Sequence, residues 1–253
     1  LEAYGNRIPS LSFEVFADEA PVSLGQIVSD LSDQAVSDAA PTLLDGFAAT
    51  GDTIRSIVSL FSDSVGLRLI ENGDTLSLVE SGATASPPAL NDLGATASHE
   101  MKPRIRQERS GASAVPTSLA MRYLDPDRDY QPGMHRSVRA GGASRELRLD
   151  MPATLTSAHA AALAEGAMAR RVAAQDRASL TLPWRFLSLK AGQDIALPDV
   201  KGMWRIAAIS VEAMVVALTL ERLPDALPVS VASSGGRIVG EEDLPHGPTH
   251  IAL

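Results

Sequence analysis

The chain has 253 residues, of which 45% are hydrophobic and 21% charged, a balance typical of a folded globular protein rather than a disordered one. Its net charge of −9 argues against nucleic acid as the main partner, because binding by counterion release needs a basic surface. It contains no cysteine, which excludes disulfides and thiol nucleophiles, and no apolar run approaches the roughly 18 residues of a membrane-spanning helix.

Apolar and polar residues alternate close to the N-terminus. Leu11, Phe13 and Val15 share one side of an extended chain, which is typical of a half-buried strand. A signal peptide would show basic residues, an apolar run and a small-residue cleavage site, and the sequence does not have this pattern. We therefore predict a strand that belongs to a piece of a longer chain.

Two amphipathic helices are predicted next. Ser23 and Gln26 have the form of a capping box, and apolar residues then recur at helical spacing to about Ala35. Asp52 is expected to cap a second helix, and Gly66 can end that helix in the left-handed conformation.

A hairpin follows the helices. Two strand patterns flank Asn72-Gly73, a pair that favours tight hairpin turns. We therefore predict that residues 22–80 form a small unit of two helices packed on a hairpin. The stretch that follows carries Pro87-Pro88 and few large hydrophobic residues, which is typical of a linker.

The second half of the chain combines strands with one long helix. Strand character returns at 117–124, and an alanine-rich stretch at 155–176 has high helix propensity. The alternating segments 204–209 and 215–220 are predicted to form a second hairpin. Trp184 and Trp204 both lie in strand patterns, where we expect them to pack in a core.

The histidines do not indicate a metal site. His246 and His250 are four residues apart, a ligand spacing on a helix, but Pro245, Gly247 and Pro248 forbid a helix there. The sequence contains none of the common hydrolase, nucleotide-binding or metalloprotease motifs. We therefore assign no catalytic, cofactor-binding or metal-ligating residue, and we expect neither an enzyme nor a cofactor.

The stretch 125–129, Asp-Pro-Asp-Arg-Asp, resembles the start of a calcium loop. The EF-hand pattern needs Gly at the sixth position and Glu at the twelfth, and these positions hold Tyr130 and Arg136. We predict a turn with capping carboxylates instead. A basic stretch just before it is interpreted as a solvated strand face or loop; its residues are Lys102, Arg104, Arg106 and Arg109.

Five segments, by their order and spacing, resemble a known family. They are YGNRIPSLSFEV, LGQIVSDLSDQA, LLDGFAATGDTIRSIVSLFSDSVGLRLIENGDTLSLVE, MRYLDPDRDYQPGMHRSVR and LTLPWRFLSLKAGQDIALPDVKGMWRIAAI. The chain is similar in them to the putative phage tail protein family, which includes tail-tip or baseplate hub proteins of siphophage-like tails and gene transfer agents.

Two motifs support this resemblance. The family's Tyr-x-Asp…Asp-Tyr-Gln element is matched by Tyr123, Asp125, Asp129, Tyr130 and Gln131. Its Leu-x-x-Gly-Asp-x-Ile strand entry is matched with one departure, because Gln193 stands between the Gly and the Asp.

The resemblance implies an α+β fold. It has a β-barrel-like hub domain with one long Ala-rich helix, plus a small inserted domain of two helices and a hairpin. The implied division is a strand left from a preceding hub domain (1–21), the inserted domain (22–80), a linker (81–97), the hub domain (98–223) and an extended C-terminal linker (224–253).

The resemblance also implies a structural role in the virion tail, assembled in the bacterial cytoplasm. Such hubs typically form trimers with two barrel-like domains per subunit, and their ring connects the tail tube to the distal tip and other tail proteins. DNA would pass through the ring without being bound. The alternative is a receptor- or carbohydrate-binding module of a tail or secretion apparatus. For self-association we expect unpaired sheet edges at 180–184 and 215–220.

Overall fold

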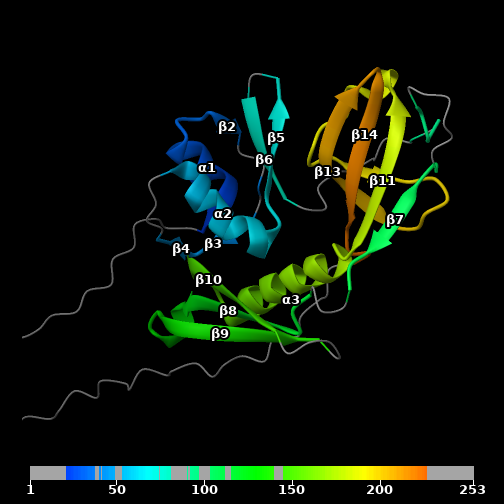
Figure 1. Ribbon diagram of the computed structural model, residues 1–253. Helices are drawn as coiled ribbons and strands as arrows, with labels where there is room; N and C mark the ends of the chain where they lie inside the picture. The colour runs from blue at the N-terminus through cyan, green and yellow to red at the C-terminus, as the bar shows by residue number, and fades with distance from the viewer. Residues whose placement is uncertain are drawn as a thin grey trace, which may run out of the picture.

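The computed structural model describes residues 21–37, 40, 42–48, 53–73, 75–80, 90, 92–96, 103–111, 115–139 and 145–226 (Figure 1). Outside these residues lie the predicted strand near the N-terminus, nearly all of the predicted terminal segments, and Lys102, His246 and His250.

The helices and 3₁₀ turns of the described residues are α1 Leu24–Leu31, α2 Ile54–Val65, α3 Ser157–Ala173, η3 Pro126–Arg128 and η4 Trp184–Phe186. The strands are β1 Val22–Ser23, β2 Val36–Ser37, β3 Leu43–Leu44, β4 Gly46–Phe47, β5 Arg68–Asn72, β6 Thr75–Val79, β7 Arg106–Arg109, β8 Ser118–Asp125, β9 Gln131–Val138, β10 Glu146–Thr154, β11 Asp176–Pro183, β12 Asp194–Ala196, β13 Met203–Glu212 and β14 Val215–Arg222.

The first two helices begin at the predicted kind of cap. The Ser23 hydroxyl accepts a hydrogen bond from the Gln26 N–H, so the predicted start of α1 is confirmed. The helix ends earlier than predicted, and Asp33 and Gln34 follow it with φ of 50° and 65°. Thr53, one residue after the predicted Asp52, caps α2.

Two hairpins are confirmed. Gly66 ends α2 with φ of 79°, and β5 then pairs antiparallel with β6 around the predicted turn at Asn72-Gly73. The second hairpin joins β13 to β14 through Ala213 and Met214, which have φ of 46° and 63°. Two successive left-handed residues are the signature of a type I′ turn, a turn that normally uses Asn or Gly.

A four-stranded sheet with strand order β4-β10-β8-β9 forms the lower layer in Figure 1. Strand β8 is antiparallel to β9 and parallel to β10. Helix α3 packs on one face of this sheet, and α2 packs on α3. Ala160, Ala164 and Ala167 of α3 are fully buried, because small side chains allow the helix to lie close to its neighbours.

A five-stranded antiparallel sheet with strand order β12-β13-β14-β11-β7 rises from the end of α3 (Figure 1). Smaller sheets, β2-β6-β5 and β1-β3, belong to the N-terminal unit. The chain is therefore mostly β-sheet with few helices, which confirms an α+β fold. Each sheet of the described residues is open at both edges, so the barrel-like part of the prediction is not confirmed.

Two hydrophobic cores hold these layers together. The first joins Phe61 and Leu78 of the N-terminal unit to Leu119 and Met121 of β8 and to the alanines of α3. The second lies on the five-stranded sheet around Trp204. Residues 22–80 therefore share a core with the four-stranded sheet and α3. The predicted domain boundaries themselves stay predictions.

Candidate functional site

The Tyr-x-Asp…Asp-Tyr-Gln element forms the turn from β8 through η3 to β9. The Asp125 carboxylate accepts a hydrogen bond from the Asp127 N–H at 3.1 Å, and its carbonyl accepts one from the Tyr130 N–H at 2.9 Å. Asp129 and Tyr130 follow with φ of 52° and 57°. The predicted turn with capping carboxylates is confirmed, and the family's polar residues here shape a backbone turn.

Tyr123 and Gly133 face each other across this turn's two strands. A Cβ added at Gly133 would lie 2.7 Å from Cζ of Tyr123, so only glycine leaves room for the buried ring. Burial raises the pKa of the Tyr123 hydroxyl, and the negative charge of Asp125 raises that pKa further. The Tyr123 hydroxyl therefore stays neutral. The packing of its ring on Gly133 favours the observed register of β8 on β9.

The sheet edge predicted from sequence at 215–220 is wrong. Segment 180–184 lies mainly in β11 and pairs with β14 on one side. On its other side β7 reaches only as far as Ser179, and beyond it, within the described residues, only the Gly94 and Ala95 N–H groups donate hydrogen bonds, to the Thr181 carbonyl. Segment 215–220 lies in β14, between β11 and β13. Interior and edge strands of an antiparallel sheet alternate in the same way, so alternation does not reveal an edge. The edge strands of this sheet are β7 and β12, and all four residues of β7 are exposed, as predicted for Arg106 and Arg109.

Strand β9 is one edge of the four-stranded sheet. The Arg139 N–H donates a hydrogen bond to the carbonyl of Thr117, the residue before β8. The odd-numbered residues of β9 therefore turn their backbone polar groups toward β8. The N–H and C=O groups of Met134, Arg136 and Val138 therefore point away from the sheet. Within the described residues no strand pairs with them.

Strand β10 presents the opposite edge. The Ser118 N–H bonds to the Arg145 carbonyl, so odd-numbered residues turn toward β8 and the backbone groups of Glu146, Arg148 and Asp150 point outward. The short β4 pairs only with the far end of β10, at Ala153–Thr154. The first part of β10 is thus open within the described part of the chain.

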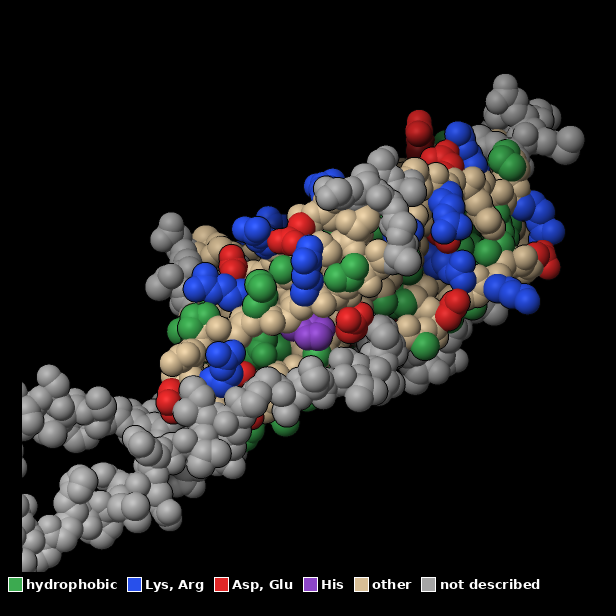
Figure 2. Space-filling model, turned by 90° about the horizontal axis from the view of Figure 1, so that it is seen from below, with side chains coloured by type: hydrophobic (Ala, Val, Ile, Leu, Met, Phe, Trp, Pro, Cys, Tyr) green, Lys and Arg blue, Asp and Glu red, His purple; other side chains and the backbone are tan. Residues whose placement is uncertain are grey.

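The outer face of this sheet carries an ion network. Glu146 lies between Arg136 at 2.9 Å and Arg148 at 3.0 Å. The hydrogen bond from Arg148 holds the pKa of Glu146 below its ordinary value, and the charge of Arg136 adds to this. Figure 2 shows the molecule from this side, with basic, acidic and hydrophobic side chains interspersed rather than gathered in one patch.

A buried ion network joins the two halves of the molecule. Asp194 of β12 accepts hydrogen bonds from Arg68 of β5 at 2.6 Å and from Arg205 of β13 at 3.0 Å. The Asp194 and Arg68 side chains are 2% and 8% exposed. Burial lowers the pKa of the Arg68 guanidinium, and the nearby charge of Arg205 lowers it further. Lys190 adds a hydrogen bond to the Glu71 carbonyl across the same junction.

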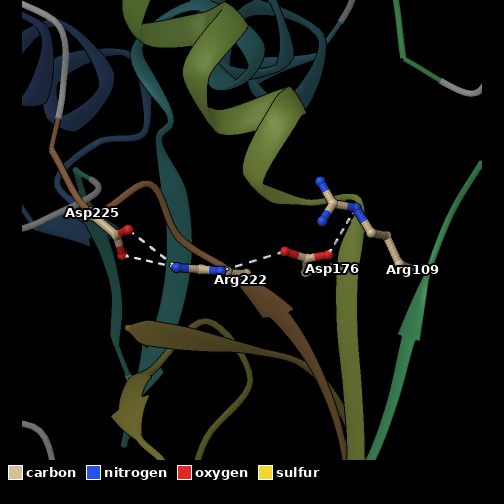
Figure 3. A network of polar contacts seen from close by, with 4 residues as sticks. All are labelled: Arg109, Asp176, Arg222 and Asp225. Atoms are coloured by element: carbon tan, nitrogen blue, oxygen red, sulfur yellow. Dashed lines mark hydrogen bonds and ion pairs between the residues drawn. The ribbon is translucent and has the colours of Figure 1, made fainter. Parts of the chain in front are cut away.

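A second network lies where α3 leads into β11 (Figure 3). Asp176 is 3.5 Å from Arg109 of β7 and 3.5 Å from Arg222 of β14, and Arg222 also contacts Asp225 at 3.1 Å. All four side chains reach solvent. The network ties three neighbouring strands of one sheet together.

The two tryptophans differ from each other in their surroundings. Trp204 is in the core, as predicted, but Trp184 is 60% exposed, so the prediction is wrong for that residue. Strand β11 ends at Pro183, and η4 then turns Trp184 outward at the same end of the sheet as Met214. Met214 and Leu187 are exposed there too. Pro183 is the sequence signal that the strand ends before Trp184.

The histidines and carboxylates of the described residues make structural contacts. They contain no group of three His, Cys, Asp or Glu that could hold a metal ion. Glu165 of α3 accepts a hydrogen bond from Ser137 at 2.9 Å and lies 3.7 Å from His135, which fastens the helix to β9. No helix among the described residues is long and apolar enough to cross a membrane.

The fold therefore defines the class of protein as an α+β module of several open sheets. A family model described as "Putative phage tail protein" matches residues 53–209, more than half of the chain. The chain belongs to this phage tail protein family.

Solved structures share the fold. A chain of the virion of a native gene transfer agent particle aligns with a TM-score of 0.69 and 19% identity, over 86% of this chain and 50% of that one. The 43 kDa tail protein of prophage MuSo2 from Shewanella oneidensis aligns with a TM-score of 0.50 and 16% identity, over 81% of this chain and 67% of that one. The chain thus spans half the length of the gene transfer agent chain. Among curated proteins, no sequence matches.

Proposed function

We propose that this chain is a structural component of a phage or gene-transfer-agent tail tip, part of a baseplate hub ring that connects the tail tube to the distal tip. It acts by assembly rather than by catalysis. The full-length subunit self-associates as a trimer in the bacterial cytoplasm, contacts other tail proteins, and lets DNA pass through the ring without binding it.

The observation that carries this proposal is that the four-stranded sheet is open, within the described residues, along β9 on one side and along the first part of β10 on the other, where β4 covers only the far end. A ring needs two different surfaces on each subunit that meet head to tail and close. Open strand edges supply such surfaces, because their backbone groups bind another strand. Membership of the phage tail protein family and the fold shared with a gene transfer agent virion chain support a place in such a tail.

The test is to locate the protein in assembled particles. Particles carrying a tagged full-length copy are expected to show the tag at the tail tip by cryo-electron microscopy, and deletion of the gene is expected to leave tails without tips. A tag spread along the tube, or tips that persist after deletion, would overturn the proposal.

Exposed Trp184 favours a second candidate, the receptor- or carbohydrate-binding module. Sugar rings stack on exposed aromatic faces, and Trp184 presents one at the start of η4. If this function holds, Trp184→Ala abolishes binding on a glycan array while Trp204, in the core, is left intact. Equal glycan-binding signals from the unmodified protein and Trp184→Ala would exclude a stacking role for Trp184.

A further inference from the structure

We propose that the five-stranded sheet is a hinged arm, which a polar latch between β5 and β12 holds against the N-terminal unit and which swings away when the latch opens. The latch consists of Arg68 with Asp194 and of Lys190 with Glu71, and the hinge lies where α3 leads into β11. This inference goes beyond the proposed assembly role and does not depend on it.

The two hydrophobic cores are independent of each other. They have no residue in common, because one lies between the N-terminal unit, α3 and the four-stranded sheet, and the other lies on the arm. Within the described residues no strand outside the arm pairs with a strand of the arm, so no ladder hydrogen bond joins it to the rest. Parts of one chain move relative to each other unless the interface between them is large and hydrophobic.

The chain passes between the arm and the rest at one end of the sheet. Helix α3 leads into β11 through Gln175, and the N–H of Ser110, the residue after β7, donates a hydrogen bond to the Gln175 carbonyl at 2.9 Å. The remaining connection, through residues 81–89, lies outside the described residues. Two connections therefore run side by side, which is the arrangement that a hinge needs.

The latch lies where the arm stands beside the β5–β6 hairpin in Figure 1. The Arg68 guanidinium donates a hydrogen bond to the Asp194 carboxylate at 2.6 Å, and the Lys190 ammonium donates one to the Glu71 carbonyl at 2.7 Å. Water can take the place of such polar partners when they separate, whereas it cannot replace an apolar contact. A polar latch can therefore open without exposing either hydrophobic core.

The closed latch also carries an opposing force. The Nε and Nη2 atoms of Arg68 are buried and have no hydrogen-bond partner among the described residues. Arg205 contacts the same Asp194 carboxylate at 3.0 Å, so two cations share one counter-charge. Opening returns Arg68 to water and leaves Asp194 paired with Arg205 inside the arm, which relieves the cost of burying unsatisfied N–H groups. The open arrangement is thus a minor state that the chain reaches without unfolding.

Spin labels on two introduced cysteines can measure the swing, because the chain has no cysteine of its own. Leu76→Cys lies on β6 of the N-terminal unit and Met214→Cys lies in the β13–β14 turn, and both positions are exposed. Strand β11 starts at the hinge and ends beside Val215, next to this turn, so Met214 lies at the end of the arm that moves most. Pulsed electron paramagnetic resonance on the 253-residue chain gives the distances between the labels.

A control pair reports whether the arm itself stays folded. Met214→Cys is combined with Gln107→Cys on the exposed strand β7, so that both labels lie within the five-stranded sheet. This distance should be the same in every latch variant.

Two latch variants are expected to shift the distance from Leu76→Cys to Met214→Cys in opposite directions. Asp194→Asn removes the charge that holds Arg68, so the fraction of molecules at the longer distance should rise about tenfold, as for the loss of one charge-assisted hydrogen bond. Arg205→Met removes the competing cation and should lower that fraction. An equal rise in both variants, or no change in either, would overturn the inference, because a network that only stabilises the fold does not give opposite shifts.

If Asp194→Asn loses the control distance within the arm, Lys190→Met decides instead. The Lys190 side chain is exposed, so the fold should tolerate the change, and loss of its hydrogen bond to Glu71 should raise the longer-distance fraction about threefold. An unchanged fraction would overturn the hinge. The place of the protein in particles is measured separately, so the tail-tip proposal can stand when this one fails.

Discussion

Asp194 and Asp176 each lie between two arginines, yet the two networks have opposite surroundings. Asp194 contacts Arg68 and Arg205 in the interior, at 2.6 and 3.0 Å. Asp176 contacts Arg109 and Arg222, both at 3.5 Å, where water reaches every side chain. The attraction between charges is strong in the interior and screened at the surface. One aspartate between two arginines therefore fixes a junction in one place and contributes little in the other.

The networks also differ in what they join. Asp194 connects β5, from the N-terminal unit, to the five-stranded sheet, so it lies between the two cores. The Asp176 network stays within β7, β11 and β14, which the ladder hydrogen bonds already hold. We infer that the orientation of the two halves depends on the buried network.

The largest effect is expected for Asp194→Asn. The substitution keeps the size of the side chain but removes the negative charge between Arg68, which is buried, and Arg205, which is 18% exposed, and we expect it to cost about 3–5 kcal/mol of unfolding free energy. Urea unfolding followed by circular dichroism measures it. A loss no larger than that of Asp176→Asn would show that burial does not distinguish the two networks.

Arg68→Met is expected to cost less, about 1.5–3 kcal/mol, the range for a hydrogen bond to a charged group. Asp194 keeps Arg205, and Met fills much of the space of the arginine stem. The substitution also avoids the cost of burying the Arg68 cation, a cost that shows in the lowered pKa of its guanidinium, and this offsets part of the loss. The same urea titration measures the unfolding free energy of Arg68→Met. A loss equal to that of Asp194→Asn would contradict the expected smaller cost.

Much of the local structure could be predicted from sequence, because it depends on near neighbours. The Ser23 cap, the Asn72-Gly73 hairpin and the Asp125 turn are each specified within a few residues. The long-range features were not predictable in the same way. Arg68 and Asp194 are far apart in the chain, and nothing around either residue indicates the other. Edge and interior strands share one pattern, so β9 and β10 became visible as edges only with the strand order.

A smaller effect is expected for Asp176→Asn, at most about 1 kcal/mol, as for other exposed ion pairs. Because these charges are screened, the difference from the unmodified protein should shrink further in high salt. Unfolding at low and high salt measures both values. A salt-independent loss of several kcal/mol would place Asp176 in the same class as Asp194.

Glu146, a third acid between two arginines, gives the smallest effect and the clearest direction. Its pKa in the folded protein is lower than in the unfolded chain, where glutamate titrates at about 4.3, because Arg148 and Arg136 favour the carboxylate. The folded state therefore binds the proton less readily, and the stability that this difference supplies is present above pH 4.3 and is lost as the pH falls through the folded pKa. NMR titration of the Glu146 carboxyl carbon should give a pKa below that of a glutamate in a model peptide, and Arg148→Gln should raise it. If the Glu146 titration curves of the unmodified protein and of Arg148→Gln coincide, the hydrogen bond from Arg148 to Glu146 does not hold in solution.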